Sequence, residues 1–266
     1  MLRNVFLKSL RDLRRGFVWW SIGLAGMSAM MVSVYPTVRG NAALDKLVKS
    51  YPDALKGFIG FGGELDYTSA AGYLGIELFS LVVPLLLLVA AIGAGANAVA
   101  GEEDRGTLDL LFSLPVSRAR VALEKFGALA AESVALGLVV WVSLWIGAVA
   151  VGMDISAAKL AAAVVDAVAL AVAYGSIALL AGCATGRRGL AIGVASAAAV
   201  AAYLVNSLAP LVDALSPVQK LSPFYYYAAH SPLREGLDPL HMLFLVGVAA
   251  LALAGSVAAF RRRDLA

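Results

Sequence analysis

One charged segment, residues 101–118, holds the spacing that comes closest to a known chemical site, and it stands between two long apolar stretches. Gly101 and Gly106 have the spacing of the glycines in a phosphate-binding loop. Thr107, however, stands where the lysine of such a loop belongs, and the three residues after Gly101 are acidic and would repel phosphate. The segment is therefore not predicted to bind ATP.

The rest of the sequence has no pattern typical of a catalytic or metal site. It contains neither the HExxH helix of zinc proteases nor the GxSxG turn of serine hydrolases. The two histidines, His230 and His241, have no cysteine or acidic cluster at ligand spacing, and the single cysteine, Cys183, lies among apolar residues. We expect no enzyme activity from the chain by itself, and no catalytic, cofactor-binding or metal-binding residue.

Two carboxylates, Glu132 and Asp166, fall deep within apolar stretches and have no obvious cationic partner in their own segments. A charge in the hydrocarbon of a membrane is costly, and such residues are often functional. Both are candidates for lining a transport pathway or for hydrogen bonding across a helix interface. Asp166 is expected to face the interior of a helix bundle rather than lipid.

The composition indicates a membrane protein. Of 266 residues, 61% are hydrophobic and 15% are charged, whereas soluble proteins have about 25% charged residues. A spanning helix needs about 20 mostly apolar residues, and six stretches qualify: about 17–35, 72–100, 121–151, 159–183, 190–208 and 239–260. The predicted fold is an all-α integral membrane protein with one six-span domain, residues 17–266, and with long outer loops at 37–71 and 209–238.

Residues 1–16 are predicted to form an amphipathic helix that lies in the membrane interface before the first span. Apolar residues such as Val5, Phe6 and Leu13 recur at helical spacing. Cations occupy the other side, where they would lie near anionic headgroups: Arg3, Lys8, Arg11, Arg14 and Arg15.

The placement of Lys and Arg predicts the orientation. With six spans, 14 of the 21 basic residues fall on the side that holds both termini and the charged segment. Short cytoplasmic loops carry the excess of positive charge, so both termini are expected in the cytoplasm. The chain is thus expected to be a multi-pass protein of the cell membrane. Because the basic residues follow this topology and form no separate basic face, nucleic-acid binding is not expected.

The charged segment is predicted to contain a short cytoplasmic helix between spans 2 and 3. Gly106 permits a turn, the Thr107 hydroxyl can cap the helix that follows, and Pro115 ends it. Ser117 can cap the next helix. The apolar side chains of the short helix recur at i, i+3 and i+4, which places them on one face that is suited to contact another protein: Leu108, Leu111 and Phe112.

Residues 103–118 also resemble the signature of type-2 ATP-binding-cassette (ABC) permeases. The Gly-Thr-Leu, Leu-Leu, Pro-Val-Ser and Arg elements occur in the same order, and Lys125 fits a lysine often found after that motif. Residues 221–224 resemble a loop motif common before the last span. The resemblance covers the topology of the whole chain, but it says almost nothing about the substrate.

The resemblance implies a permease subunit of an ABC exporter in a prokaryotic cell membrane. Its partners would be cytoplasmic ABC ATPase subunits, which bind ATP and magnesium, a second permease copy or a paralogue, and membrane lipid. The short helix would seat in a groove of the ATPase and transmit its closure. The residues assigned to this coupling are Glu103, Gly106, Thr107, Leu108, Leu111, Phe112, Pro115 and Arg118.

Three other interpretations remain open at this point. The first is a secondary carrier driven by an ion gradient through Glu132 or Asp166, although no inverted repeat with interrupted helices is evident. The second is an intramembrane enzyme, and the third is a membrane scaffold or sensor that transports nothing. The apolar, small-residue spans would suit a drug, a lipid or an amphipathic peptide as cargo.

Overall fold

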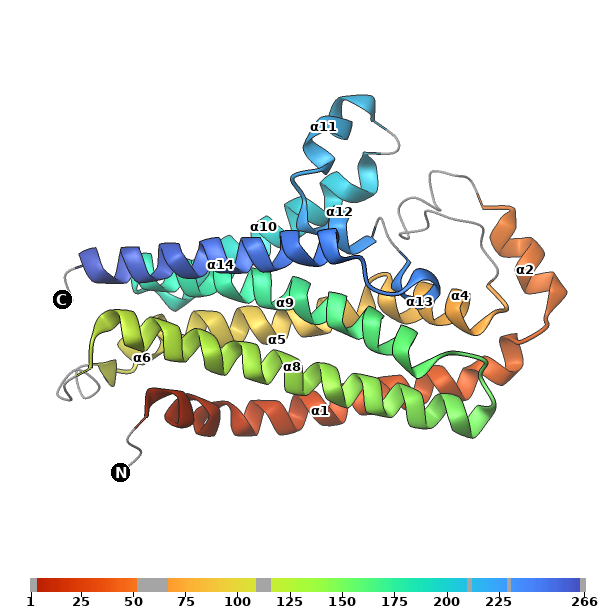
Figure 1. Cartoon of the computed structure of the whole chain (residues 1–266), viewed down its shortest axis with the longest axis horizontal. Helices are drawn as coiled ribbons and strands as arrows, with labels where there is room; N and C mark the ends of the chain where they lie inside the picture. Colours follow the sequence, from red (N-terminus) through yellow and green to blue (C-terminus); the bar gives the residue numbers. More distant parts are fainter. Residues whose placement is uncertain (1–3, 52–66, 109–115, 210–211, 229–230, 264–266) are drawn as a thin grey trace.

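A computed structural model describes residues 4–51, 67–108, 116–209, 212–228 and 231–263. Within these residues the chain forms helices and no β-strand (Figure 1). Six helical stretches are long and apolar enough to cross a membrane, which confirms the predicted fold class. They are α1 (Val5–Val38), the stretch Ala70–Ala98, α8 (Arg118–Val151), α9 (Ala157–Thr185), α10 (Arg188–Leu208) and α14 (Pro239–Arg262).

The second stretch is composite. It consists of α4 (Ala70–Leu74), a π-helical turn (Gly75–Phe79) and α5 (Val82–Ala98). The short helix α6 (Ala100–Asp104) directly follows α5 and carries the first part of the charged segment. Pro84 lies in the first turn of α5, where proline is tolerated because its missing N–H would have no partner there.

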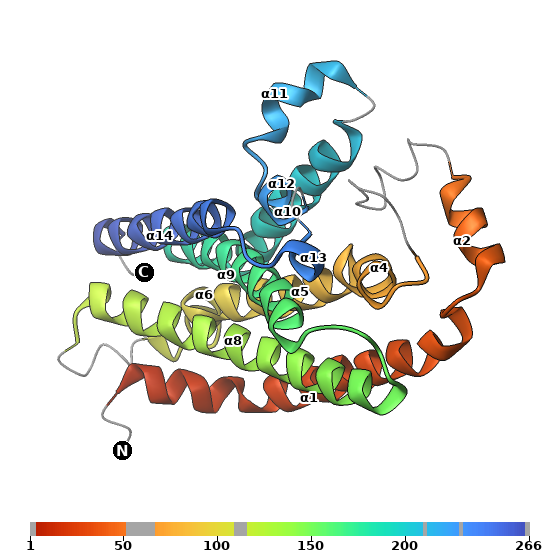
Figure 2. The ribbon, with the colours of Figure 1, turned by 45° about the vertical axis from the view of Figure 1, so that its right-hand side comes forward.

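Short helices occupy the two long connections that were expected on the outer side. The first holds α2 (Ala42–Lys49), and the second holds a 3₁₀ turn (Asp213–Leu215), α11 (Ser216–Gln219), α12 (Pro223–Ala228) and α13 (Pro232–Glu235). Figures 1 and 2 show α2 beyond the end of the bundle remote from the termini, and α11 projecting from the side of the bundle.

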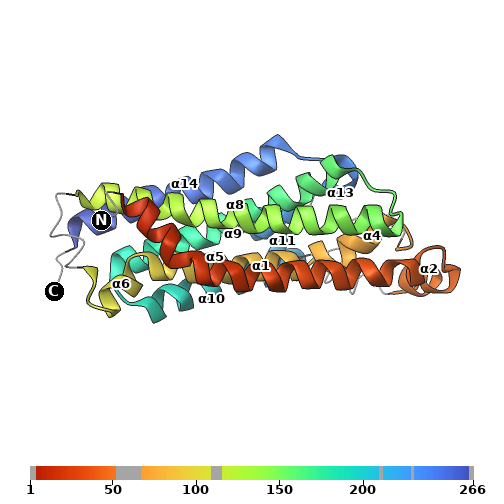
Figure 3. The ribbon, with the colours of Figure 1, turned by 90° about the horizontal axis from the view of Figure 1, so that it is seen from below.

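The N-terminal region differs from the expected arrangement of an interfacial helix followed by a separate span. α1 is one helix of 34 residues. It begins after Asn4, whose side chain accepts a hydrogen bond from the Phe6 N–H at 2.9 Å, and no proline interrupts it before Pro36. Its first turns bend away from the remainder (Figure 3). The helix is thus continuous through residue 16, and the interfacial position of residues 1–16 stays a prediction.

Helix α9 is the centre of the bundle and packs against α5, α8, α10 and α14. The contact with α5 depends on two glycines, because a Cβ atom on Gly95 would clash with the Gly175 carbonyl oxygen. A Cβ atom on Gly175 would in turn lie 2.9 Å from the carbonyl oxygen of Ala91. Small residues allow the backbones of membrane helices to approach closely, so these glycines set the spacing between α5 and α9.

Both termini lie at one end of the bundle, together with α6 (Figure 1). This end also contains the starts of α1, α8 and α10 and the last turn of α14, and we call it the charged end. Even numbers of spans return a chain to the side on which it began, so the shared location of the termini follows from the six spans.

Replacing Gly175 with valine is expected to destabilise the bundle, because the new side chain meets the α5 backbone, which cannot move without separating the helices. Overpacking of this kind costs about 1–3 kcal/mol or more. The thermal unfolding midpoint of the purified chain in detergent should therefore fall. Gly247→Val is the matched control, because a Cβ atom at Gly247 meets nothing within 4 Å; equal midpoints for the two variants would contradict the packing described.

Candidate functional site

The charged segment begins with a closed helix end rather than an open loop. Gly106 has a φ of 65°, in the left-handed region that glycine adopts without strain. Its N–H donates to the Glu103 carbonyl at 2.9 Å, and the Thr107 N–H donates to the Glu102 carbonyl at 2.9 Å. This pair of bonds is the Schellman motif, which ends α6.

Thr107 thus has a role that the sequence did not predict. Its hydroxyl donates to the Glu102 carbonyl oxygen at 3.1 Å, which strengthens the end of α6. Helical backbone resumes at Leu108. The predicted contacts Leu111 and Phe112, and the predicted stop at Pro115, lie outside the described residues, so their roles stay predictions.

Leu108 is buried rather than presented for contact. Its side chain is 3% exposed. It lies in a second apolar cluster, whose other members come from α1, α8, α9, α14 and the α5–α6 junction: Val5, Val99, Val121, Ala122, Leu179, Cys183 and Phe260. In this structure Leu108 therefore anchors the charged segment to the bundle, and its predicted contact with an ATPase stays a prediction. Helical periodicity could not distinguish these roles, since it shows which residues share a face but not what the face meets.

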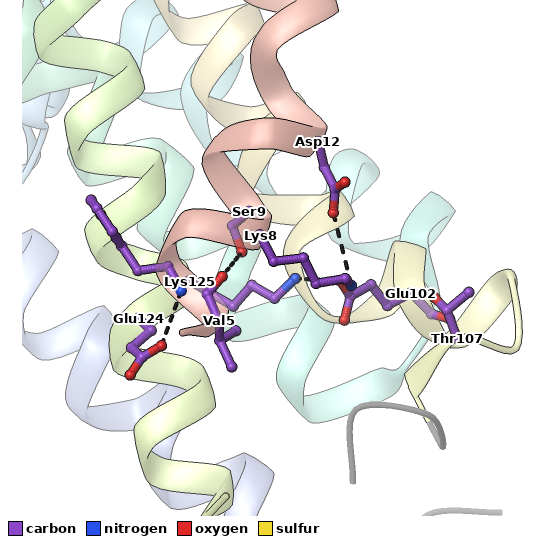
Figure 4. Close-up of polar contacts among 9 residues, drawn as sticks. Val5, Lys8, Ser9, Asp12, Glu102, Thr107, Glu124 and Lys125 are labelled. Atoms are coloured by element: carbon purple, nitrogen blue, oxygen red, sulfur yellow. Dashed lines mark hydrogen bonds and ion pairs between the residues drawn. The ribbon is translucent and has the colours of Figure 1, made fainter. Parts of the chain in front are cut away.

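The charged segment is held to the bundle by a buried ion cluster (Figure 4). The Glu102 carboxylate oxygen Oε1 accepts from Lys8 Nζ at 2.5 Å and from Lys125 Nζ at 2.6 Å. Glu102 is 2% exposed and Lys125 4%. We call Lys8, Glu102 and Lys125 the charge cluster. It joins α1, α6 and α8, three elements that are far apart in the sequence.

Glu102 is ionised in this setting. Burial alone would raise the pKa of its carboxyl group, but the Lys125 charge and the hydrogen bonds from Lys125 and Lys8 outweigh burial and lower the pKa below its ordinary value. Two cations therefore share one carboxylate, so removing that carboxylate leaves the Lys125 ammonium buried without its partner.

A second set of contacts ties the charged segment to the end of α14. The Glu103 carboxylate forms an ion pair with the Arg263 guanidinium. Arg118, at the start of α8, donates to the Phe260 carbonyl at 3.2 Å and also to the Arg263 carbonyl. Ser117 caps α8 as predicted, accepting from the Arg120 N–H at 3.2 Å. The predicted coupling residues Glu103 and Arg118 thus meet around the last turn of α14.

A cavity of about 400 Å³ opens beside the charge cluster, between α1, α5, α6 and α8. Glu102, Arg105 and Lys125 line it at the charged end, and Trp20, Leu129 and Glu132 line it farther along the helices. Glu132 is 7% exposed. This residue, selected from sequence as a candidate pathway residue, is therefore placed by the structure in the wall of a cavity.

Asp166, the other carboxylate predicted to be functional, lies elsewhere. It is 2% exposed on α9, which confirms that it faces the bundle interior. It is close enough to Tyr227 of α12 to raise the pKa of that phenol, although burial contributes more. Asp166 is not part of the lining of the cavity that contains Glu132.

Sequence reasoning missed Glu102 and Lys8 as members of the site. Glu102 was treated as one of three acidic residues that would repel phosphate, and Lys8 as one of several cations at the membrane interface. Only Lys125 gave a signal, through its place after the permease motif. The pairing depends on the packing of α1 against α8, for which the sequence contains no local pattern.

The sequence profile of one known family, described as the C-terminal domain of the multidrug efflux system permease Rv1217c, matches residues 2–261. No characterised protein in a curated collection matches the chain. Because the profile covers nearly all 266 residues, the chain belongs to this permease family. Together with the six membrane-spanning helices, this establishes a membrane permease with a transport role.

Glu102→Gln is expected to destabilise the protein, since it keeps the shape of the side chain but leaves a buried lysine unpaired. Breaking a buried ion pair in this way costs about 3–5 kcal/mol. Asp12→Asn is the control, because Asp12 is more than half exposed and pairs with Lys8 at 3.8 Å at the surface, where such pairs contribute about 0–1 kcal/mol. Thermal unfolding in detergent measures both, and a loss no larger for Glu102→Gln would contradict the buried cluster.

The same variant predicts a pH dependence. A carboxyl group whose pKa is lowered by folding contributes stability above its ordinary pKa, about 4.3, and this contribution is lost as the pH falls through the lowered value. The difference in unfolding midpoint between wild type and Glu102→Gln should stay constant from about pH 7 to about pH 5 and shrink in stronger acid. A difference that grows in acid would show that Glu102 is not the ionised partner.

Proposed function

From its place in this permease family, we propose that the chain is the membrane subunit of an ABC exporter, driven by ATP hydrolysis in a separate cytoplasmic ATPase. The observation that supports this proposal best is the attachment of the charged segment at both of its ends. Glu102 and Leu108 hold its beginning to α1 and α8, and Arg118 holds its end to α14. A displacement of the segment would reach several spans at once.

In the proposed mechanism this attachment transmits movement of the ATPase to the membrane helices. Closure of the ATPase on ATP and magnesium displaces the segment, and α6 moves with it. Because α6 directly follows α5 and is paired with Lys8 and Lys125, α5 shifts together with the charged ends of α1 and α8. The space between the helices then closes to one side of the membrane and opens to the other.

The proposed orientation places the charged end in the cytoplasm. The excess of Lys and Arg at this end supports it, because positively charged loops are retained on the cytoplasmic side. The same end carries the segment that resembles the ABC permease motif, so both arguments direct the ATPase to one surface. We propose that two permease units, identical or paralogous, complete the translocation path in a prokaryotic cell membrane.

A pair of leucine variants in the charged segment tests the proposal. Leu111→Asp is expected to abolish copurification with an ABC ATPase coexpressed from a neighbouring reading frame, while the unfolding midpoint of the permease stays unchanged. Leu108→Asp should instead lower the midpoint, because the Leu108 side chain is buried and an unpaired buried charge is strongly destabilising.

Two results would contradict the assignment. One is a Leu111→Asp variant that retains both the ATPase and substrate-stimulated ATP hydrolysis. The other is sustained ATP hydrolysis by the purified permease without the ATPase, because the proposal assigns the ATP site to the partner.

An ion-coupled carrier is the second candidate, and the position of Glu132 in the cavity favours it. The two proposals differ in energy source. In inverted membrane vesicles that contain the permease and its ATPase, uptake of a transported dye is expected with ATP in the presence of a protonophore. Uptake that requires a proton gradient and proceeds without ATP would favour the carrier instead.

A further inference from the structure

We propose that the cavity between α1, α5 and α8 binds a lipophilic organic cation, with the positive centre at Glu132 and the apolar groups against the surrounding walls. The proposal names a substrate class for the permease. That the bound cation is then exported rests on the proposed function. Binding itself requires neither ATP nor an ATPase.

The carboxylate of Glu132 is the feature that selects for charge. It is 7% exposed, it lines the cavity, and no hydrogen bond or ion pair joins it to another described residue. A buried carboxylate without a partner is costly, so a cation that enters the cavity gains an interaction for which no protein group competes.

The positions of the other charges leave this carboxylate available. Lys125 precedes Glu132 by two helical turns on α8, and its ammonium is already bonded to Glu102 at 2.6 Å. The remaining titratable groups in the lining, Asp12 and Arg105, also lie toward the charged end, on the early part of α1 and just after α6. Deeper along α8, Glu132 is the one titratable side chain that the described lining contains.

The walls around Glu132 suit an organic ion better than a metal ion. They include Val89, Ala90 and Leu129, and the described residues contain no group of three or more metal-ligating side chains. Calcium needs six to eight oxygen ligands, which this lining does not supply. Trp20 also lines the cavity, and tryptophan is the aromatic side chain that attracts cations best.

The cavity has room for such a ligand. Its volume of about 400 Å³ falls within the range of about 300–1,000 Å³ that is typical of small-molecule sites. Gly16 and Gly93 contribute to the wall, and a Cβ atom at either position would meet nothing within 4 Å. Larger side chains at these positions would fill the cavity without displacing neighbouring atoms of the protein.

Equilibrium binding of tetraphenylphosphonium to the full-length chain in lipid nanodiscs, without an ATPase, tests the proposal. Tetraphenylborate serves as the anion of the same shape. Saturable binding is expected for the cation and not for the anion. Glu132→Gln, which removes the charge, and Gly93→Leu, which fills the cavity but keeps the charge, should each weaken cation binding about tenfold or more, a change of about 1.4 kcal/mol.

The controls separate the site from the rest of the bundle. Gly247→Leu, at another glycine with open space beside it, and Asp166→Asn, at a buried carboxylate outside the cavity, should bind the cation as wild type does. Unfolding midpoints identify any variant that fails to fold. The proposal is overturned if the two probe ions bind alike, if no saturable binding occurs, or if Glu132→Gln and Gly93→Leu, both folded, bind with wild-type affinity. None of these results affects the ATPase assignment, which Leu111→Asp tests separately.

Discussion

The buried carboxylate of Glu102 is the interaction on which the charged end depends. Three elements supply its surroundings: Lys8 from α1, Lys125 from α8, and the backbone of α6. Because a buried charge is stabilised only while its partners remain in place, this end of the bundle cannot separate into independent helices without a large free-energy cost. The ion pairs therefore hold α1, α6 and α8 together, and α6 carries the first part of the charged segment.

The rest of the bundle lets this unit act on the membrane interior. Gly95 and Gly175 hold α5 and α9 in close backbone contact, whereas the cavity lies on the other side of α5, against α1 and α8. Glu102 and Lys125 belong both to the charge cluster and to the cavity wall. In the proposed mechanism, a displacement that starts at the charged segment changes the mouth of the cavity directly, without a relay through distant residues.

The sequence was sufficient for the features that depend on composition and local pattern. Six apolar stretches predicted six spans, the Ser117 cap was predicted from its place before α8, and Gly106 was predicted to make a turn. Features that depend on contacts between distant segments were not predictable. The spacing predicts one helical face for Leu108 and Leu111, but residues of α1, α9 and α14 pack around Leu108. Glu102 and Glu103 are neighbours in sequence, yet one pairs with α1 and α8 and the other with Arg263.

The role of the charge cluster in coupling can be tested by exchanging the charges of Glu102 and Lys125 in the assembled transporter. Glu102→Lys, Lys125→Glu and the double variant, each assembled with the ABC ATPase in nanodiscs, would be compared for the increase in ATP hydrolysis that the permease gives the ATPase. The account predicts that a single variant that still folds and binds the ATPase loses most of this increase, and that the double variant, which restores an opposite-charge pair between α6 and α8, recovers much of it. Folded and assembled single variants that stimulate ATP hydrolysis as fully as wild type would contradict it.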